Sequence, residues 1–173
     1  MSADCELVVP SVEYRDSFLE AAKEYKAEGS VRFDFELAER DFPQFIKELN
    51  EHSLGLHMPE GYVPETMYWL IDGGEYIGQI NIRHELNEHL RQIGGHIGYD
   101  IRSSKRNKGY GTAQLQLMLP KAKEMGLTRV LITCDVTNIG SRKIIESAGG
   151  VLENQAPNPD TGIDKLRFWV SLG

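Results

Sequence analysis

The sequence predicts a domain of the mixed α/β class, built on one β-sheet that contains both antiparallel and parallel strands. The chain has 173 residues, of which 40% are hydrophobic and 26% charged, values typical of one globular domain. Its hydrophobic patterns follow the order strand, two helices, three strands, helix, strand, helix, two strands. This order suits a mixed sheet better than a doubly wound one, because three strands follow one another without a helix. We see no internal repeat and no linker, so residues 1–173 are expected to form a single domain.

The first third of the chain is expected to hold one strand and two helices. Residues 5–9 form a short, partly β-branched run that Pro10 closes, which is typical of a strand. Ser11 is expected to cap a helix that Gly29 ends. Four apolar residues at three- and four-residue spacing give that helix its buried face: Phe18, Ala21, Ala22 and Tyr25. A second helix is predicted over residues 41–49, and residues 53–64 are expected to form a loop.

Three consecutive strands are predicted in the middle of the chain. Residues 66–71 and 76–83 are strand-like, and the Asp-Gly-Gly turn at 72–74 between them is a strong hairpin signal. Residues 85–92 are a polar connection to a third segment, residues 96–102, in which apolar and other side chains alternate. We therefore expect an antiparallel meander.

A glycine-initiated helix and a buried strand are predicted next. The helix follows residues 109–111 and ends at Gly126, and Pro120 inside it is expected to cause a kink. Residues 130–134 are almost continuously apolar, which is typical of a strand buried on both faces in a parallel pairing.

The chain is expected to finish with one helix and two strands. Asn138 is placed to begin the helix, and Gly149 and Gly150 end it. Short strands are predicted at residues 151–152 and 166–170, on either side of a turn-rich segment.

Composition and charge exclude several classes of protein. The net charge of −7 argues against a nucleic-acid partner, because such proteins gain affinity from cations that displace phosphate counterions. No apolar run approaches the ~18 residues of a membrane-spanning helix, and residues 1–10 lack a basic leader, so we expect a cytoplasmic protein without a membrane partner. The spacing of Cys5 and Cys134 indicates neither a zinc site nor a disulfide framework. A homodimer is left open.

The segment at residues 101–112 is the most informative part of the sequence. It joins a strand to a helix, and glycines there allow main-chain N–H groups to surround an anion. Arg102, Lys105, Arg106 and Lys108 fall within seven residues that contain no acid, and we expect them to add charge-assisted bonds to phosphate. The alternative is a glycine-permitted turn with a solvated basic flank.

Two motifs resemble those of a known family. Arg106-x-x-Gly109-x-Gly111 after a strand resembles the acyl-coenzyme A loop, Q/R-x-x-G-x-G/A, of the GCN5-related N-acetyltransferases (GNAT). Asn138-x-x-Ser141, in the helix after the buried strand, is similar to the second cofactor segment of that family. The predicted order of elements also agrees with the GNAT fold from residue 4 to residue 171.

The resemblance implies acetyl-coenzyme A as co-substrate and assigns residues to it. The main chain of Ile101 and Arg102 would bond to the pantetheine amides, and Asn138 and Ser141 would contact the pantetheine arm and the nucleotide side. One continuous run would hold the pyrophosphate: Arg106, Asn107, Lys108, Gly109, Tyr110, Gly111 and Thr112. Residues 67–71 and the first two helices would shape the pocket of the amine acceptor.

Transfer of an acetyl group to an amine needs a base, a hydrogen-bond donor to the carbonyl oxygen, and an acid for the departing thiolate. His96 and Glu85 are the candidate bases, and a structural histidine and a solvated acid are the alternatives for them. Family members often carry a tyrosine seven residues after the asparagine, where it serves as the acid, but that position is Ile145 here. Tyr99 is the candidate acid, with a core aromatic as the alternative. Main-chain N–H groups near residues 99–101 are expected to donate to the oxygen.

The predicted function is therefore direct transfer of an acetyl group from acetyl-coenzyme A to a primary amine. A non-catalytic sensor of acyl-coenzyme A is the main alternative, because of Ile145. A nicotinamide oxidoreductase is disfavoured, since Gln114 occupies the place of the third glycine in G-x-G-x-x-G. His84 and His89 lie five residues apart, one too many for a zinc-binding helix, so no metal is expected. Residues 1–60 carry a net charge of −8, which favours a cationic acceptor such as a polyamine, an aminoglycoside or a lysine side chain.

Overall fold

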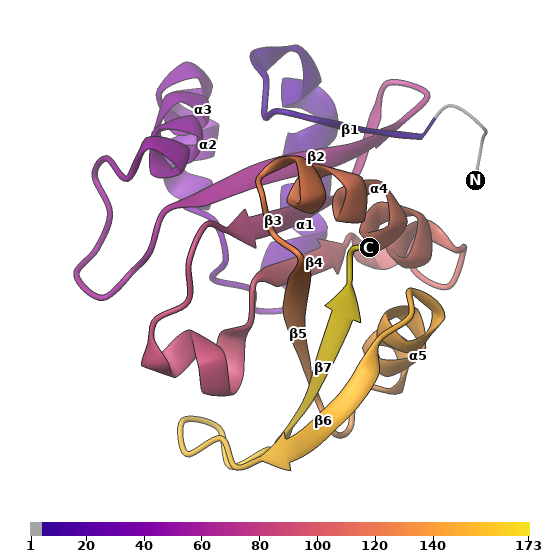
Figure 1. Ribbon diagram of the computed structural model, residues 1–173. Helices are drawn as coiled ribbons and strands as arrows, with labels where there is room; N and C mark the ends of the chain where they lie inside the picture. Colours follow the sequence, from indigo (N-terminus) through magenta and orange to yellow (C-terminus); the bar gives the residue numbers. More distant parts are fainter. Residues whose placement is uncertain (1–4) are drawn as a thin grey trace.

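The structure, a computed structural model, describes residues 5–173 and is built around one seven-stranded mixed sheet. The strands lie in the order β1-β2-β3-β4-β5-β7-β6 (Figure 1). Their bounds are Glu6–Val8 (β1), Glu65–Asp72 (β2), Glu75–Arg83 (β3), Ile97–Ile101 (β4), Arg129–Asp135 (β5), Val151–Ala156 (β6) and Lys165–Ser171 (β7). Every neighbouring pair is antiparallel except β4 and β5, which confirms the mixed α/β class.

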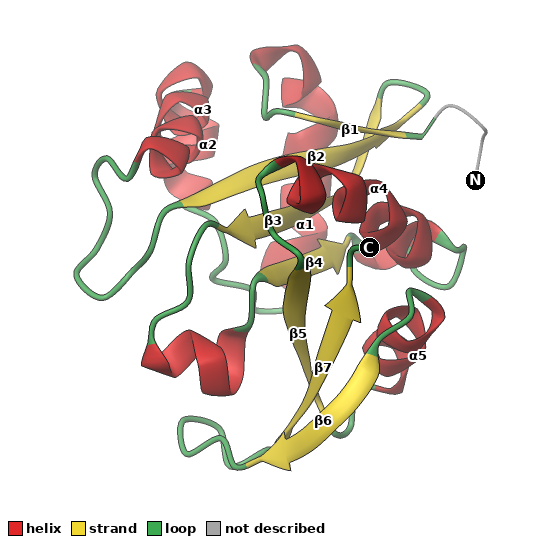
Figure 2. Cartoon of the chain, viewed as in Figure 1, coloured by secondary structure: helices red, strands yellow, loops and turns green. Residues whose placement is uncertain are grey.

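Five α-helices cover the two faces of this sheet (Figure 2). They are α1 (Arg15–Ala27), α2 (Phe35–Arg40), α3 (Phe42–Glu51), α4 (Tyr110–Glu124) and α5 (Ile139–Ser147). The first three share a core with the inner residues of β2, in which the rings of Phe18 and Trp69 stack at 4.8 Å. Helices α4 and α5 share a second core with β3, β4, β5 and β7. The acceptor side and the cofactor side predicted from the sequence thus lie on opposite faces.

Helices α2 and α3 meet at an aspartate, and the predicted second helix corresponds to α3 alone. Asp34 caps α2 by accepting a hydrogen bond from the Leu37 N–H at 2.8 Å. Asp41 ends α2 and also caps α3, accepting from the Gln44 N–H at 3.1 Å. The prediction of a helix over residues 41–49 is confirmed, and α2 was missed because a six-residue helix shows less than two turns of periodicity.

The central meander is as predicted. Strands β2 and β3 pair from Glu65 and Arg83 to Asp72 and Glu75, and β3 continues antiparallel to β4. Gly73 and Gly74 both have positive φ angles, 60° and 82°, which a two-residue hairpin turn of type I′ requires. The connection to β4 contains a π-helical turn, Leu90–Gly94, which no periodic pattern in the sequence had indicated.

Helix α4 and strand β6 differ in detail from the expectation. The helix runs without interruption from Tyr110 to Glu124 and contains Pro120. Strand β6 is longer than predicted and lies at the edge of the sheet, where five of its six residues are exposed. Its polar residues therefore carry no alternating pattern that could have defined its length.

Strands β4 and β5 diverge, and this divergence positions the site. They pair in register at Ile97 and Ile132, and beyond that pair they separate (Figure 1). We call this divergence the fork. Gly95 makes the close approach at its base possible, because a Cβ atom there would lie 2.5 Å from the Leu131 carbonyl oxygen. His96 joins both strands, donating its N–H to the Leu131 oxygen at 2.7 Å.

Candidate active site

A cavity of about 220 Å³ opens at the fork. Its walls come from three places: Tyr99, Asp100 and Ile101 of β4, the loop and first turn of α4, and the first turns of α5. The sequence had placed these segments in two separate motifs about 30 residues apart. The fold brings them together because β5 runs between α4 and α5 and returns the chain to the fork.

The N-terminus of α4 is built to receive an anion. Its first intrahelical bond runs from the Ala113 N–H to the Gly109 oxygen at 3.1 Å, so the N–H groups before it have no acceptor within the helix. No side chain of the described residues caps this end. Asn107 and Gly109 have positive φ angles of 59° and 86°, and such left-handed residues turn successive N–H groups toward one concave side.

These features fit the pyrophosphate of acetyl-coenzyme A. A 15-residue helix presents unpaired N–H groups and the positive end of its dipole at one wall of a cavity. The fork beside it leaves room for an extended chain to lie against β4. Arg106, Asn107, Tyr110 and Gly111 line the cavity directly, whereas Lys108, Gly109 and Thr112 belong to the same turn without lining it.

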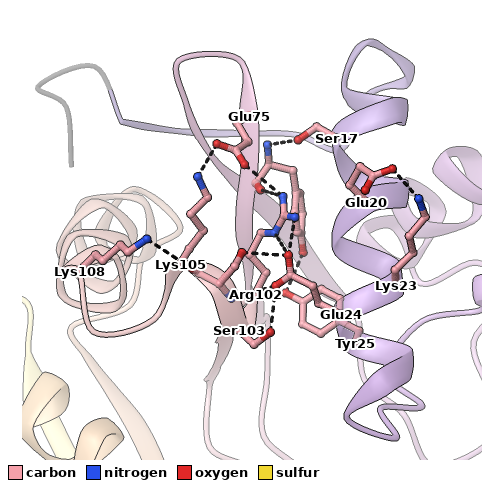
Figure 3. Close-up of polar contacts among 12 residues, drawn as sticks. Ser17, Glu20, Lys23, Glu24, Tyr25, Glu75, Arg102, Ser103, Lys105 and Lys108 are labelled. Atoms are coloured by element: carbon pink, nitrogen blue, oxygen red, sulfur yellow. Dashed lines mark hydrogen bonds and ion pairs between the residues drawn. The ribbon is translucent and has the colours of Figure 1, made fainter.

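The basic side chains of the loop point toward acids of α1 and of the β2–β3 turn (Figure 3). Arg102 is 8% exposed and donates to Glu24 and Glu75. Lys105 Nζ lies 2.5 Å from a Glu75 oxygen, and Arg106 forms a two-pronged ion pair with Glu28 at 2.6 and 2.8 Å. Hydrogen bonds from Arg102, Ser103 and Ser104 lower the pKa of Glu24 to about 2, against the opposing effect of burial. Glu24, Glu28 and Glu75 thus pair with three of the four basic side chains, whereas Lys108 Nζ donates to the Ser104 oxygen at 2.9 Å. Bonds from these side chains to phosphate remain a prediction.

The edge of β4 that faces the fork is occupied by side chains of the protein. The Ile101 N–H donates to Asp100 Oδ1 at 2.7 Å, and Arg106 Nε donates to the Ile101 oxygen at 2.8 Å. The Arg102 N–H points the other way and donates to Ile77 of β3 at 3.0 Å. Ile101 therefore presents its main chain to the fork, while the corresponding groups of Arg102 are used elsewhere.

Tyr99 and Ser141 meet across the cavity. The Tyr99 hydroxyl lies 2.6 Å from Ser141 Oγ, which joins β4 to the first turn of α5. Burial raises the pKa of Tyr99 to about 12, and the hydrogen bond to Ser141 opposes this shift. Asn138 Oδ1 accepts from the Ser141 N–H at 3.0 Å, so Asn138 caps α5 and fixes the position of the serine. Ile145 is fully buried in the core.

The two candidate bases lie outside the cavity. His96 is 8% exposed, and its Nδ1 accepts a hydrogen bond from the Leu131 N–H at 2.9 Å. Burial, together with the charges of Arg91 and Arg83, lowers the pKa of His96 to about 4. Glu85 is exposed on the connection that follows β3. Both residues remain predictions, but neither lines the cavity at the fork.

Sequence reasoning missed Asp100. This carboxylate lines the cavity, and its side chain is 25% exposed. Its signal was an acid within an otherwise apolar strand between two apolar or aromatic neighbours, a position where acids are depleted. Gly140 and Ile144 also line the cavity and were not singled out.

A polar groove lies on the opposite face of the sheet, above β3. It is formed by Gln79, Asn81 and Arg83 of β3, by Glu65 and Met67 of β2, and by residues 30–32 of the loop after α1. We call it the β3 groove. Asn81 Nδ2 donates to Glu65 Oε2 at 2.6 Å, and Arg83 Nε lies 3.7 Å from the same oxygen. Met67 belongs to the strand that was expected to shape the acceptor pocket.

The described residues contain neither a membrane-spanning helix nor a metal-binding cluster. None of the helices in residues 5–173 is long and apolar enough to cross a membrane. Within the same residues, no group of three or more histidine, cysteine, aspartate or glutamate side chains is placed to hold a metal ion.

Comparison with solved structures identifies the fold. RimL, the ribosomal L7/L12 alpha-N-protein acetyltransferase in complex with coenzyme A, aligns with a TM-score of 0.70 at 17% identity, over 98% of this chain and 95% of that one. The microcin C7 self-immunity acetyltransferase MccE, in complex with acetyl-CoA and AMP, aligns with a TM-score of 0.70 at 16% identity, over 98% and 93%. An acetyltransferase from Salmonella typhimurium that modifies the N-terminal serine of ribosomal protein L7/L12 gives 0.70 at 16%, over 98% and 96%.

Sequence comparison identifies the family. No curated protein matches the chain significantly. The model of the acetyltransferase (GNAT) domain matches residues 20–151, which include the loop before α4, the fork and most of α5. This match and the fold agree with the resemblance found in the two motifs. The chain is an acyltransferase that belongs to the GNAT acetyltransferase family.

Proposed function

We propose that this protein transfers the acetyl group of acetyl-coenzyme A directly to a primary amine while both substrates are bound. One observation carries the proposal: the uncapped N-terminus of α4 and the edge of β4 that faces the fork line the same cavity. The first suits a diphosphate, and the second suits the amides of a pantetheine arm. Ile101 would pair with that arm once Asp100 and Arg106 release its main-chain groups.

The reaction needs little from the protein beyond positioning and proton transfer. The neutral amine nitrogen attacks the thioester carbonyl carbon, and the C–N bond forms as the carbonyl π electrons move to oxygen. Collapse of this intermediate restores the carbonyl and breaks the C–S bond, so the thiolate leaves with the bonding electrons. The amine loses two protons if it arrives as an ammonium ion, and one of them ends on the thiolate.

Tyr99 and Ser141 are the groups best placed to serve the thiolate. Their hydroxyls form one hydrogen-bonded pair within the cavity, on the side of α5 where the family tyrosine would project. Because Tyr99 has a high pKa, its proton stays on the phenol and the pair can donate to a neighbouring anion. In this proposal the pair supplies the proton that the isoleucine at position 145 cannot donate.

An acyl-cysteine route is disfavoured. Cys134 is 4% exposed, and burial raises the pKa of its thiol, which lowers the fraction of nucleophilic thiolate. Cys134 belongs to the core shared by α4, α5 and β5. Direct transfer is therefore favoured, because it does not require Cys134 to become exposed and deprotonated.

The acceptor is proposed as an amine on a protein or a small molecule. RimL and the Salmonella enzyme act on the amino terminus of a ribosomal protein, and MccE confers immunity to a microcin. The acidic first third of this chain favours a cationic acceptor, although five of its glutamates pair with basic side chains of the protein (Glu20, Glu24, Glu28, Glu39 and Glu51). A cytoplasmic location remains a prediction.

The experiment is release of free thiol from acetyl-coenzyme A with a panel of amines. The panel holds a hexapeptide with N-terminal serine, spermidine, kanamycin and Nα-acetyl-lysine amide. We expect thiol release that depends on one class of amine and an acetylated product of matching mass. Binding of coenzyme A without amine-dependent thiol release would favour the sensor instead.

A further inference from the structure

We propose that Asp100 is the general base that takes the proton from the acceptor amine and that Gln79 orients this amine. The inference rests on the proposed acetyl transfer and assigns its proton acceptor. It replaces neither Tyr99 nor Ser141, which lie on the thiolate side of the cavity.

Asp100 lies where the two hollows of the molecule meet. It lines the cavity at the fork, together with Tyr99 and Ile101. Its register partner on β3 is Gln79, whose side chain lies on the same face of the sheet and lines the β3 groove. Arg32 lines the same groove, and its Nε lies 3.9 Å from Asp100 Oδ2. An amine that reaches a thioester in the fork from the β3 groove must therefore pass this carboxylate.

The two oxygens of Asp100 differ in their surroundings. Oδ1 accepts the Ile101 N–H at 2.7 Å and lies 3.6 Å from Arg106 Nη2, and this ion pair keeps it anchored when a pantetheine arm takes the Ile101 N–H. Oδ2 has Arg32 at 3.9 Å, beyond hydrogen-bonding distance, as its nearest ion-pair partner in the described residues. An anchored carboxylate with one oxygen left for a proton is the geometry that a positioned base requires.

Burial raises the pKa of Asp100 above its ordinary value and makes the carboxylate a stronger base. Charged and titratable groups face it from each neighbouring element. Arg32 and Arg106 oppose the shift, as does the Ile101 N–H, while Glu28 of α1 adds to it. Tyr25 of α1 faces the same carboxylate and is itself kept neutral, because burial raises its pKa well above the ordinary value.

Gln79 gives independent evidence that a polar ligand binds beside Asp100. Its side chain is fully buried, and neither its Oε1 nor its Nε2 has a hydrogen-bond partner within residues 5–173. A buried amide without partners is destabilising by about 1–3 kcal/mol, so its presence calls for a role. Directly opposite Asp100 in a β-ladder, its Oε1 can accept one N–H of an amine whose other N–H faces the carboxylate.

The other carboxylates near the two hollows are engaged. Glu65 is at the far end of the β3 groove and binds Asn81 and Arg83. Glu24, Glu28 and Glu75 are held by the arginine and lysine side chains of the loop before α4. None of these three lines either hollow.

In the proposed step, an acceptor ammonium gives one proton to Asp100 Oδ2 and becomes the neutral nucleophile. After the C–N bond forms, the nitrogen loses its second proton and the C–S bond breaks, while the thiolate receives a proton through the Tyr99–Ser141 pair. Asp100 releases its proton to solvent after the products leave. Overall, an ammonium and a thioester yield an amide, a thiol and one proton.

The test compares Asp100→Asn with wild type on the amine that the panel identifies, from pH 6 to pH 9.5. Asp16→Asn is the matched control, since Asp16 is a surface residue whose side chain is 93% exposed. We expect Asp100→Asn to lower kcat/KM by about 10²-fold at pH 7. For a peptide α-amine, whose pKa is about 8, the deficit should shrink to a few-fold at pH 9.5, because the amine is then already neutral; for a lysine-type amine, whose pKa is about 10.4, it should only begin to shrink at that pH. Affinity for coenzyme A, measured by calorimetry, should stay within threefold.

The possible outcomes distinguish failure of the proposed acetyl transfer from failure of Asp100 as its base. If wild type shows no amine-dependent thiol release with any amine of the panel, acetyl transfer fails and the base fails with it. If wild type is active and Asp100→Asn is equally active, or equally impaired at every pH, the base assignment alone is overturned. Carbon-13 NMR of the free enzyme adds a readout without turnover: the carboxyl signal absent from Asp100→Asn should titrate above pH 3.8, and ionisation below that pH contradicts the proposal.

Gln79 is tested as a positioning residue by Gln79→Met, which keeps its length and removes the amide. We expect KM for the amine to rise about tenfold with kcat within twofold, and the melting temperature to increase, because the unpartnered amide is gone. Gln79→Glu should restore an acceptor oxygen and recover part of the loss in KM. A Gln79→Met enzyme with unchanged KM contradicts the role.

Discussion

Arg102, at the end of β4, is bound by Glu24 of α1: its Nε and Nη2 donate to the same carboxylate oxygen at 2.9 and 2.5 Å. The other oxygen of Glu24 accepts the Ser104 N–H at 2.9 Å. One carboxylate of the acidic first third thus holds the strand end and the loop that leads to α4 (Figure 3). The shape of the anion site depends on α1, although no residue of α1 lines the cavity.

Glu24→Gln is expected to destabilise the protein by about 2 kcal/mol, since it leaves the buried Arg102 without its charged partner. The pKa of Glu24 is about 2 in the folded state and 4.5 in the reference state. A lowered carboxyl pKa contributes stability that is complete above pH 4.5 and is lost as the pH falls toward 2. The difference in melting temperature between wild type and Glu24→Gln should therefore be largest at pH 6 and shrink toward pH 3. A constant difference over that range contradicts this account.

His96 is expected to act in stability and not in proton transfer. Its pKa is lowered to about 4, and its Nδ1 holds the Leu131 N–H at the base of the fork. A lowered histidine pKa contributes stability above pH 6.5 that is lost as the pH falls through 4. His96→Ala should lower the melting temperature at pH 7, whereas His96→Asn, which can offer an oxygen near the Nδ1 position, should recover part of it. Loss of the alkaline or acidic limb of the kcat/KM profile in a folded His96→Asn enzyme would restore His96 as the base.

Gly111 is expected to be required for the packing of α4 against α5. A Cβ atom at this position would lie 2.6 Å from Ile144 Cδ1, far inside normal contact. Gly111→Ala should therefore lower the melting temperature and weaken binding of coenzyme A. Ile144→Val removes that methyl group, so the double variant Gly111→Ala/Ile144→Val should bind coenzyme A more tightly than Gly111→Ala alone. If the second substitution gives no recovery, the contact is not the cause.

The Tyr99–Ser141 pair is expected to influence release of the thiolate. Tyr99→Phe and Ser141→Ala each remove one hydroxyl, and each should lower kcat about 10-fold to 100-fold with little change in KM for acetyl-coenzyme A. Because the hydroxyls act as one pair, the double variant should be little worse than either single variant. Additive effects of the two substitutions would show that the hydroxyls act separately. Ser147→Ala, at the other end of α5 and outside the cavity, is the control for loss of a hydroxyl on that helix.

Much of the fold could be predicted because local patterns and packing agree. The hairpin turn at Gly73 and Gly74, the helix face of α1 and the apolar run of β5 each depend on a few neighbouring residues. The two motifs could be joined into one site because they follow β4 and β5 of a known fold order. The π-helical turn at Leu90–Gly94 and the short helix α2 lacked any such local signal.

The directions of the charged side chains could not be predicted. Four basic residues in seven indicated a positive surface, but the glutamates that pair with three of them lie 27 to 78 residues distant in the chain. Asp100 was overlooked for a similar reason: its importance comes from the fork beside it and from Gln79 on the neighbouring strand. A histidine that titrates near neutrality was the more familiar base, yet burial lowers the pKa of His96 and its Nδ1 accepts the Leu131 N–H, neither of which the sequence could indicate.

The most direct measurement of the central claim is a titration of the ¹⁵N-labelled protein with coenzyme A, followed by amide chemical shifts. The account predicts saturable binding, with the largest shifts at the N–H groups of Tyr110, Gly111 and Thr112 and at Ile101. Binding that leaves these four amides unmoved, or no binding at millimolar coenzyme A, would contradict the claim that the start of α4 holds the diphosphate beside the fork.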